Sequence, residues 1–355
     1  MSKAPAVAVI GAGPAGAMAA LQLARAGLSV QIIGKQKRPR RYVGETLSPE
    51  GRSALTVAGI WDRLPDGIAV PCPALVSAWQ ESQPVWRSFI TNPYGSAWHI
   101  DRAQFDAWLL GEAEAAGAVC VSAAAIAVRR IGSHWVCDVR GADGEARALR
   151  ADFLILATGT YSSALQLAKR EQIDALCLIA GVSKATPTAG DALVVEAGPA
   201  GWLYSAPLPD GRIFVGWITD ADVLAGKQYR VAMESALEYA PLTSARVERS
   251  PDASCVGVAS SAMVPCAGEG WIAIGDAALA RDPLSGEGLA CALHSAREAA
   301  DTISYALAGD TTTWQKGAER AAKAVAQYQH QRLFAYRAAQ SRWPSEDFWA
   351  RRVAN

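Results

Sequence analysis

Short apolar runs separated by glycine-rich turns open the chain, and they predict the first elements of the fold. Residues 7–10 (VAVI) have the length and composition of a buried strand, residues 14–27 those of a helix, and residues 29–33 those of a second strand. Strand, helix and strand in this order predict a βαβ unit. Two later apolar runs, 152–157 (DFLILA) and 271–274 (WIAI), predict further strands of the same domain.

The middle of the chain alternates apolar and polar residues, which is typical of antiparallel strands with one solvated face. Short strands are expected within 74–99 and 119–150, and longer strands at 175–183, 191–197, 201–207 and 211–219. Helical patterns fall at 49–64, 102–116, 222–239, 286–308 and 313–340. The sequence therefore predicts an α/β fold, a Rossmann-like nucleotide-binding domain with an inserted antiparallel-sheet domain.

This order of elements divides the chain into three predicted parts. The nucleotide-binding domain is discontinuous, at 1–172 and 267–310, and includes a small strand-rich portion near 74–100. The inserted sheet domain covers 173–266, and a C-terminal helical segment covers 311–355. The change to longer alternating strands sets the first internal boundary.

Composition narrows the class of protein. Lys plus Arg and Asp plus Glu number 34 each, so a formal net charge of zero gives no electrostatic drive toward nucleic acid or an anionic membrane. The seven cysteines lack any C-x-x-C spacing and the four histidines lie far apart, so neither a disulfide framework nor a metal site is expected. Because no apolar stretch reaches about 18 residues, no membrane span is expected, and we predict a cytoplasmic protein.

The first candidate chemistry is the turn between the first strand and the first helix. Gly11, Gly13 and Gly16 match the G-x-G-x-x-G spacing of a dinucleotide-binding turn, with Pro14 and Ala15 between the last two glycines. The free N–H groups at the helix N-terminus and its partial positive charge suit a pyrophosphate. This context predicts nucleotide binding.

The acid that normally follows such a turn by about 20 residues is missing. Its position is Gly34-Lys35, followed by Gln36 and a basic run that ends at Arg41. Basic residues here are typical of an NADP 2′-phosphate site. The alternative is an FAD site in which Lys35, Gln36 or backbone groups replace the carboxylate, and in that case we expect FAD to bind less tightly than usual.

A second strand–loop–helix unit lies at 271–293 (WIAIGDAALARDPLSGEGLACAL). Asp276 at the end of the strand is suited to accept hydrogen bonds from a ribose or ribitol hydroxyl. The backbone amides of 285–288 face whatever binds at the N-terminus of the following helix. A plain structural connection would not require this combination of Asp, Pro and two Gly, so the unit predicts a second part of the nucleotide site.

These motifs, together with Ala157-Thr158-Gly159, resemble the p-hydroxybenzoate-hydroxylase superfamily of FAD proteins. Residues 43–49 (VGETLSP) and 97–109 (AWHIDRAQFDAWL) are similar to the branch that holds geranylgeranyl reductases and flavin-dependent halogenases, and to the tryptophylquinone-maturing flavoproteins. The resemblance covers about residues 6–310. It implies one FAD, rather than NADP, bound by a Rossmann-like FAD-binding domain beneath an antiparallel-sheet substrate domain.

The resemblance also implies where FAD lies. Arg102 would contact its phosphate or ribose, Asp276 its ribitol–pyrophosphate, and the loop 283–288 its isoalloxazine ring. The predicted FAD-binding residues are Gly11, Gly13, Pro14, Ala15, Gly16, Lys35, Gln36, Gly44, Glu45, Thr46, Arg102, Gly159, Asp276, Pro283, Ser285, Gly286, Glu287 and Gly288.

In this family reduced flavin and dioxygen give a C4a-hydroperoxide, and the pocket decides what receives the oxygen. Halogenases add a catalytic lysine and a W-x-W-x-I-P motif. Here no lysine lies between Lys37 and Lys169 and the motif is degraded to WLYSAP at 202–207, which disfavours halogenation. We predict an FAD-dependent monooxygenase that hydroxylates an aromatic substrate. A flavin dehydrogenase or reductase and a non-catalytic flavin-binding protein are the alternatives.

The substrate and the catalytic residues remain open at this stage. An indole is one candidate, either in a small molecule or as a tryptophan of a partner polypeptide. The aromatic residues expected to bind the substrate are Trp202, Tyr204 and Trp217, and the candidate acid–base residues are His99 and Glu287. Because no second G-x-G-x-x-G occurs, electrons are expected from transiently bound NAD(P)H, a partner flavin reductase or the substrate itself.

Overall fold

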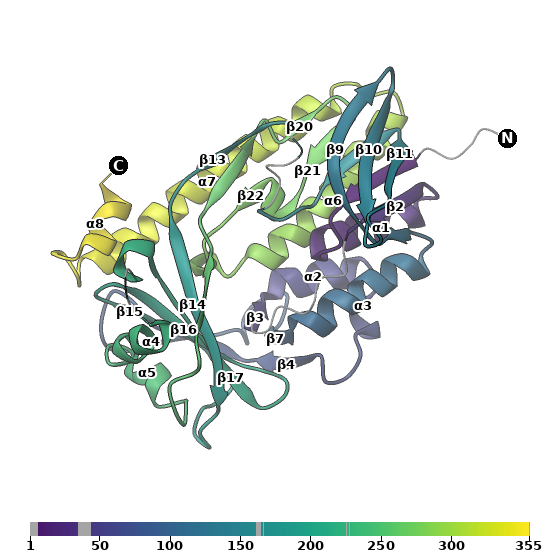
Figure 1. The fold of residues 1–355 in the computed structure, drawn as a ribbon. Helices are drawn as coiled ribbons and strands as arrows, with labels where there is room; N and C mark the ends of the chain where they lie inside the picture. Colours follow the sequence, from purple (N-terminus) through teal and green to yellow (C-terminus); the bar gives the residue numbers. More distant parts are fainter. Residues whose placement is uncertain are drawn as a thin grey trace.

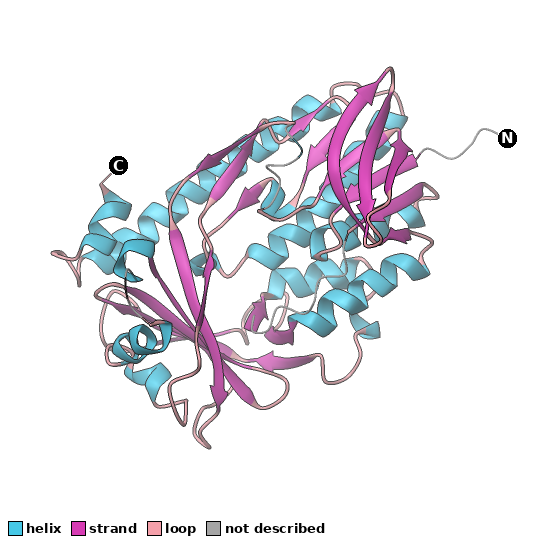
Figure 2. Cartoon of the chain, in the orientation of Figure 1, coloured by secondary structure: helices cyan, strands magenta, loops and turns pink. Residues whose placement is uncertain are grey.

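The computed structural model describes residues 6–34, 44–160, 165, 167–224, 226 and 228–354. Two sheet-containing halves lie at opposite ends of the molecule, and the long helix α7 (Thr313–Gln340) runs beside both (Figure 1). Helices and strands are mixed in each half (Figure 2). This arrangement of a Rossmann-like half and an antiparallel sheet confirms the predicted α/β fold class.

The Rossmann-like half is built on a six-stranded sheet with the order β20-β21-β12-β1-β2-β8. Every neighbouring pair is parallel except β20 and β21. Its strands are β1 (Ala6–Ile10), β2 (Ser29–Ile33), β8 (Val119–Val121), β12 (Phe153–Leu156), β20 (Ala267–Gly268) and β21 (Trp271–Ala273). Parallel strands in this order bring the chain segments that follow β1, β12 and β21 to one edge of the sheet.

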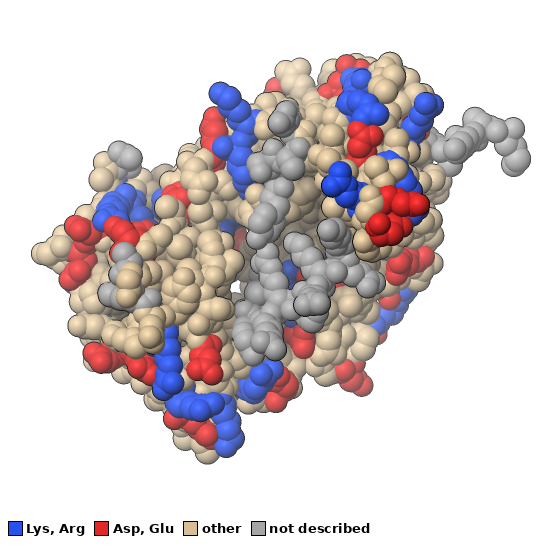
Figure 3. Space-filling model, viewed as in Figure 1, with Lys and Arg blue, Asp and Glu red and all other residues tan. Residues whose placement is uncertain are grey.

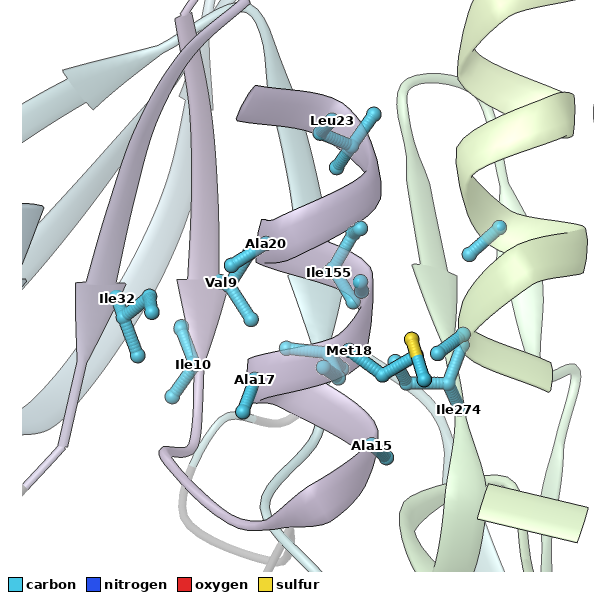
Figure 4. Packing of buried hydrophobic residues seen from close by; sticks show 14 of the residues in the cluster. Val9, Ile10, Ala15, Ala17, Met18, Ala20, Leu23, Ile32, Ile155 and Ile274 are labelled. Carbon is cyan, nitrogen blue, oxygen red and sulfur yellow. The ribbon is translucent and has the colours of Figure 1, made fainter. Parts of the chain in front are cut away.

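Helices cover this sheet closely because small side chains lie between them. α1 (Pro14–Arg25) packs against α3 (Arg102–Ala115) and α6 (Gly288–Leu307) as well as against the sheet. Figure 4 shows Val9 and Ile155 beside α1 and the Met18 side chain pointing toward Ile274, and Val9, Met18 and Ile155 are fully or almost fully buried. Burial of each such side chain contributes about 1.5–3 kcal/mol.

Two small antiparallel sheets flank the nucleotide half. One is the meander β9 (Ala123–Ile131), β10 (His134–Gly141) and β11 (Ala146–Ala151). The antiparallel prediction for 119–150 is therefore wrong at its first strand, since β8 pairs with β2 in the parallel sheet. The other sheet has the order β3-β7-β4, with β3 (Gly44–Leu47), β7 (Ala97–Asp101) and β4 (Ala69–Cys72).

The second half is a seven-stranded sheet with the order β18-β14-β17-β16-β15-β5-β6. Its strands are β5 (Ala74–Ala78), β6 (Val85–Ser88), β14 (Leu176–Lys184), β15 (Leu193–Gly198), β16 (Gly201–Pro207), β17 (Arg212–Asp220) and β18 (Ser254–Gly257). β5 pairs with β15 in parallel, whereas the other pairs are antiparallel. The strand-rich portion near 74–100 thus contributes two strands to this sheet.

Helices cover both faces of the seven-stranded sheet. α4 (Tyr229–Leu237) and α5 (Pro241–Ser244) pack on one face, and α7 with α8 (Asp347–Val353) on the other. The remaining short sheet, β13 (Lys169–Gln172), β19 (Ser261–Val264) and β22 (Leu279–Ala280), lies between the two halves. Because α7 also contacts β20, β21 and α6, the C-terminal segment packs against both halves.

Two predicted helices are shorter than expected. Residues 49–64 form α2 (Pro49–Val57) and a separate 3-10 turn, Trp61–Arg63, because Gly59 adopts φ +66° between them. Within the predicted helix 222–239, the described helical residues are those of the 3-10 turn Ala221–Leu224 and of α4. Within the described part of the chain, no helix combines the length and the apolarity needed to cross a membrane.

Candidate functional site

The turn between β1 and α1 separates glycines that the fold needs from one that faces open space. Gly11 adopts φ +118°, and a Cβ there would lie 2.1 Å from the carbonyl oxygen of Ala157. A Cβ at Gly16 would lie 1.9 Å from the carbonyl oxygen of Gly11. Gly13, the N-cap of α1, has φ −82°, and a Cβ there would meet nothing within 4 Å. Gly13 therefore leaves the space before the helix N-terminus clear.

The segment after β12 lies beside this turn. β1 and β12 are parallel neighbours, so Thr158 and Gly159 share the carboxyl edge of the sheet with Gly11 and Gly13. The Thr158 hydroxyl is buried and has no hydrogen-bond partner among the described residues. Gly159 has φ +64° and open space around its Cα. A ligand oxygen at this edge would satisfy the buried hydroxyl.

Arg102 begins α3 directly after β7. Asp101 caps the helix by accepting hydrogen bonds from the N–H groups of Ala103 at 2.9 Å and Gln104 at 3.1 Å. The Arg102 guanidinium donates to both carboxylate oxygens of Asp106, at 2.9 and 3.0 Å. Asp101 is register partner of Gly44, so the start of α3 lies next to β3. This places Arg102 beside β3, the strand that contains the predicted FAD-binding residues 44–46.

Asp276 lies in a 3-10 turn, Gly275–Ala277, directly after β21, and its side chain is exposed. The backbone of this turn is held by Arg170 of β13, which donates to the carbonyl oxygens of Asp276 at 2.6 Å and Ala277 at 3.0 Å. Gly275 adopts φ +56°, and its N–H donates to Ser295 Oγ at 2.9 Å. The turn is therefore fixed while the Asp276 side chain remains accessible.

The loop 283–288 leads into α6. Pro283–Ser285 forms a 3-10 turn, Gly286 adopts φ +60°, and a Cβ at Gly286 or Gly288 would meet nothing within 4 Å. The Glu287 side chain is 51% exposed, with its Oε2 3.6 Å from Arg281 Nη1. The loop thus presents exposed backbone and one carboxylate at the N-terminus of a long helix, where negative charge is favoured.

His99 is a buried histidine with both ring nitrogens occupied. Its Nε2 donates to the carbonyl oxygen of Asp191 at 2.9 Å, which leaves Nδ1 to accept from the Thr46 hydroxyl at 2.9 Å. Burial lowers the pKa of His99 to about 4, and its exposed fraction is 0%. The hypothesis of an acid–base role is not supported, because a neutral, enclosed imidazole with two partners has no free proton to exchange.

The three predicted substrate residues do not share one surface. Trp217 is register partner of Leu203, so it lies on the face of the sheet opposite Trp202 and Tyr204, packed under α4. Trp202 is 1% exposed, because Tyr336 of α7 and Trp349 of α8 cover it. The predictions for Trp217 and Trp202 as substrate contacts are therefore corrected to core positions, and Tyr204 is the partly exposed one of the three.

Several predicted residues lie outside what the structure describes, and others were missed. Lys35 and Gln36 fall outside the described residues, and only the backbone is described for Gly44 and Glu45. Sequence reasoning missed Asp282, which is buried next to α7 and directly precedes the loop 283–288. Asp282 is recognisable in the sequence as a polar residue of the 271–293 unit, but nothing in the sequence indicates that α7, about 50 residues later, buries it.

The comparisons with known proteins agree with this geometry. Residues 4–332 match the family described as FAD binding domain, and the chain belongs to this family. FAD is accordingly its cofactor, and the class that fold and family define is the FAD-dependent oxidoreductases. The open space at Gly13, the partnerless Thr158 hydroxyl and the exposed Asp276 fit a dinucleotide along one sheet edge.

Curated relatives carry different activities. The flavin-dependent halogenase armH4 of Armillaria mellea is 27% identical over 353 residues, which cover 85% of this chain and 65% of the relative. Menaquinone reductase of Mycobacterium tuberculosis is 29% identical over 319 residues, covering 84% of this chain and 76% of the relative. The chain spans 65% and 62% of the length of two halogenase relatives. Because the relatives include both halogenases and a reductase, the family alone does not fix the reaction.

Solved structures share the whole fold. The peptidyl tryptophan dihydroxylase QhpG, essential for tryptophylquinone cofactor biogenesis, superimposes with a TM-score of 0.80 at 28% identity, covering 98% of this chain and 78% of that one. The flavin-dependent halogenase CmlS superimposes with a TM-score of 0.89 at 24% identity, covering 99% of this chain and 68% of that one. The second likeness concerns the fold alone.

Proposed function

We propose that the protein is an FAD-dependent monooxygenase that hydroxylates an aromatic ring, with a tryptophan side chain of a partner polypeptide as the leading candidate substrate. The observation that carries this proposal is the absence of lysine from 38–168, the region where the halogenases that the chain resembles place their catalytic lysine. The 28% identity to a peptidyl tryptophan dihydroxylase over 98% of this chain supports it.

FAD would lie along the carboxyl edge of the six-stranded sheet. Gly13 and the α1 N-terminus would hold the diphosphate, with Arg102 and Thr158 beside it, and Asp276 would bind a ribitol hydroxyl. Bound and reduced, FAD supplies activation of dioxygen for transfer to a substrate. Electrons would come from transiently bound NAD(P)H or a partner flavin reductase.

This chain's own contribution would be to position the substrate and keep water away from the reacting atoms. Tyr204 lies on the sheet face that also packs against Leu284, so a substrate ring beside Tyr204 would be next to the loop 283–288. An aromatic contact of this kind contributes about 0.5–1.5 kcal/mol beyond burial. Glu287, exposed on that loop and 3.6 Å from Arg281, would accept a hydrogen bond from an indole N–H.

The test supplies the FAD-loaded protein with NADH, a flavin reductase and air. The probes are N-acetyltryptophanamide and a tryptophan-containing peptide. Mass spectrometry is expected to find one added oxygen atom per hydroxylation, labelled when isotopically heavy dioxygen is used. Incorporation of bromine or chlorine when halide is present would overturn the proposal in favour of halogenation, and no product from either probe would overturn it for tryptophan.

A reductase is the second candidate, because menaquinone reductase is 29% identical over 84% of this chain. It would transfer hydrogen to an unsaturated substrate without incorporating oxygen. Anaerobic oxidation of the reduced protein by a quinone, with no product labelled by heavy dioxygen, is the outcome expected of this candidate.

A further inference from the structure

A buried carboxylate stands directly before the loop 283–288. Asp282 is 3% exposed, and its Oδ1 accepts a hydrogen bond from the N–H of Leu284 at 3.1 Å. Its backbone N–H donates to the Tyr328 hydroxyl at 2.9 Å. Neither contact is needed for a simple strand-to-helix connection, and burial of a carboxylate is unfavourable unless it is paired. The surroundings of Asp282 therefore need an explanation.

The Asp282 carboxylate faces one stripe of α7 and a second aspartate, Asp174. Tyr328, Arg332 and Tyr336 follow each other at intervals of four residues, which places them on one face of the helix. Arg332 Nε lies 3.5 Å from Asp282 Oδ2, and Arg332 Nη2 lies 3.2 Å from Asp174 Oδ2. The Tyr336 hydroxyl also acts on the Asp282 carboxylate.

The same stripe reaches the two chain segments that enter and leave the seven-stranded sheet. Asp174 precedes β14 and accepts from the N–H groups of Leu176 at 3.2 Å and Ser260 at 2.9 Å. The Ser260 hydroxyl, between β18 and β19, hydrogen-bonds the Tyr328 hydroxyl at 2.6 Å. Asp282 is thus joined through α7 to the connection between the two halves.

A further contact extends the network into the sheet. Trp202 of β16 donates through Nε1 to the Tyr336 hydroxyl at 3.2 Å. The sheet face that carries Trp202 and Tyr204 is therefore linked to the loop 283–288 through Tyr336, Arg332, whose guanidinium carbon lies 5.0 Å from the Tyr336 ring centroid, and Asp282.

We propose that Asp282, held by Tyr328, Arg332 and Tyr336, is a positioning residue that sets the loop 283–288 against the FAD ring and aligns it with the aromatic face of the seven-stranded sheet. The inference rests on the proposed binding position of FAD. It does not rest on which substrate is oxidised. The C-terminal helix α7 thereby takes part in the site although it contributes no group to the predicted cofactor contacts.

The charge balance around Asp282 gives the proposal a measurable signature. Burial and, to a smaller extent, nearby Asp174 raise the pKa of Asp282, whereas Arg332, Tyr336 and the Leu284 N–H lower it, and the net result is a pKa of about 6. Protonation would weaken the pairing with Arg332 and release the loop. The bound flavin should then change its visible circular dichroism as pH crosses about 6.

The experiment records that signal for the FAD-loaded protein from about pH 5 to pH 8, a range that brackets the expected midpoint of about 6. The wild type should titrate, Asp282→Asn should not, and exposed Asp301→Asn should behave as the wild type. Arg332→Gln should move the midpoint to higher pH, and Arg332→Lys should restore it. A titration that survives in Asp282→Asn, or a flat wild-type signal, overturns the proposal. If Asp282→Asn does not fold, the two Arg332 variants decide.

The variant Gly288→Ala tests the proposed binding position of FAD separately from the proposed role of Asp282. A Cβ at Gly288 meets nothing in the protein, so the variant should fold, and its flavin signal should change if the ring faces the loop. An unchanged signal in Gly288→Ala contradicts the proposed binding position of FAD. A changed signal in Gly288→Ala with no titration in the wild type contradicts the role of Asp282 alone.

Discussion

Neighbouring glycines in the first turn serve different needs, and a single substitution can tell them apart. Gly11 and Gly16 are enclosed by backbone at 2.1 and 1.9 Å from a would-be Cβ, so any side chain there would disturb the strand–helix packing. Gly13 has an extended backbone and empty space in front of it. A side chain at Gly13 would occupy the space expected for the FAD diphosphate and nothing else.

Gly13→Val should therefore leave the fold intact and remove FAD. We expect apoprotein with an unfolding temperature close to that of the wild-type apoprotein, but without the yellow colour after purification. Flavin absorbance and thermal unfolding of the apo forms measure the two effects. Gly111→Val, at an exposed glycine within α3 with open space around it, is the matched control and should retain FAD. Stoichiometric FAD in Gly13→Val would contradict the predicted diphosphate site.

His99 ties stability to pH with a definite sign. Burial lowers its pKa to about 4 from an ordinary value of 6.5, so the folded state resists protonation that the unfolded state accepts. The contribution of neutral His99 to the stability of the fold is complete above about pH 6.5 and is lost as the pH falls toward 4. His99→Gln, neutral at every pH and able to keep both hydrogen bonds, should remove this slope.

The measurement is the unfolding temperature between about pH 5 and 7.5 for the wild type, His99→Gln and exposed His330→Gln. On acidification, the unfolding temperature of the wild type should fall relative to that of His99→Gln, whereas the unfolding temperature of His330→Gln should follow that of the wild type. Parallel curves for all three proteins would show that His99 is not held neutral.

At the scale of elements, the sequence predicts strands better than it predicts how they face each other. The apolar run of β1 and the glycine turn after it were identifiable because a buried parallel strand is continuously apolar. The faces of Trp202 and Trp217 were not, because alternation fixes faces within one strand, whereas the register between β16 and β17 depends on the turn that joins them. β8, with three residues, is too short to show a period.

The docking of α8 depends on a buried ion pair. Arg352 and Asp220 are both at most 7% exposed, and Arg352 Nη1 lies 3.1 Å from Asp220 Oδ2. Asp220→Asn would leave the Arg352 charge poorly compensated, which typically costs about 3–5 kcal/mol. Urea unfolding should show a loss of this size. Asp222→Asn, which removes the exposed partner of Arg351 at 2.7 Å, should change stability little. Equal effects of the two variants would mean that burial does not distinguish the pairs.

On the scale of the whole molecule, the two halves depend on the C-terminal segment in different ways. The family match ends at residue 332, within α7, and the described nucleotide site takes no side chain from α8. The aromatic face of the seven-stranded sheet, in contrast, is closed by Trp349, whose Nε1 donates to the carbonyl oxygen of Gly198 at 2.9 Å. On the face seen in Figure 3, acidic and basic side chains are interspersed over both halves, without a large patch of one sign among the coloured residues.

Truncation after Gln340 should therefore affect one half first. It removes α8 and uncovers the aromatic cluster that holds Trp202, in which Trp79 and Tyr336 pack against Trp349 at ring-centroid distances of 5.4 and 5.8 Å. The truncated chain should bind the dye anilinonaphthalene sulfonate, because a large apolar surface is left uncovered. Its unfolding transition, followed by tryptophan fluorescence, should occur at a lower temperature. Flavin release, followed by flavin fluorescence, should move much less, since α7 and its contacts with Asp282 remain. Simultaneous loss of both signals at the lower temperature would show that the sheet half and the FAD site unfold as one unit, with α8 supporting both.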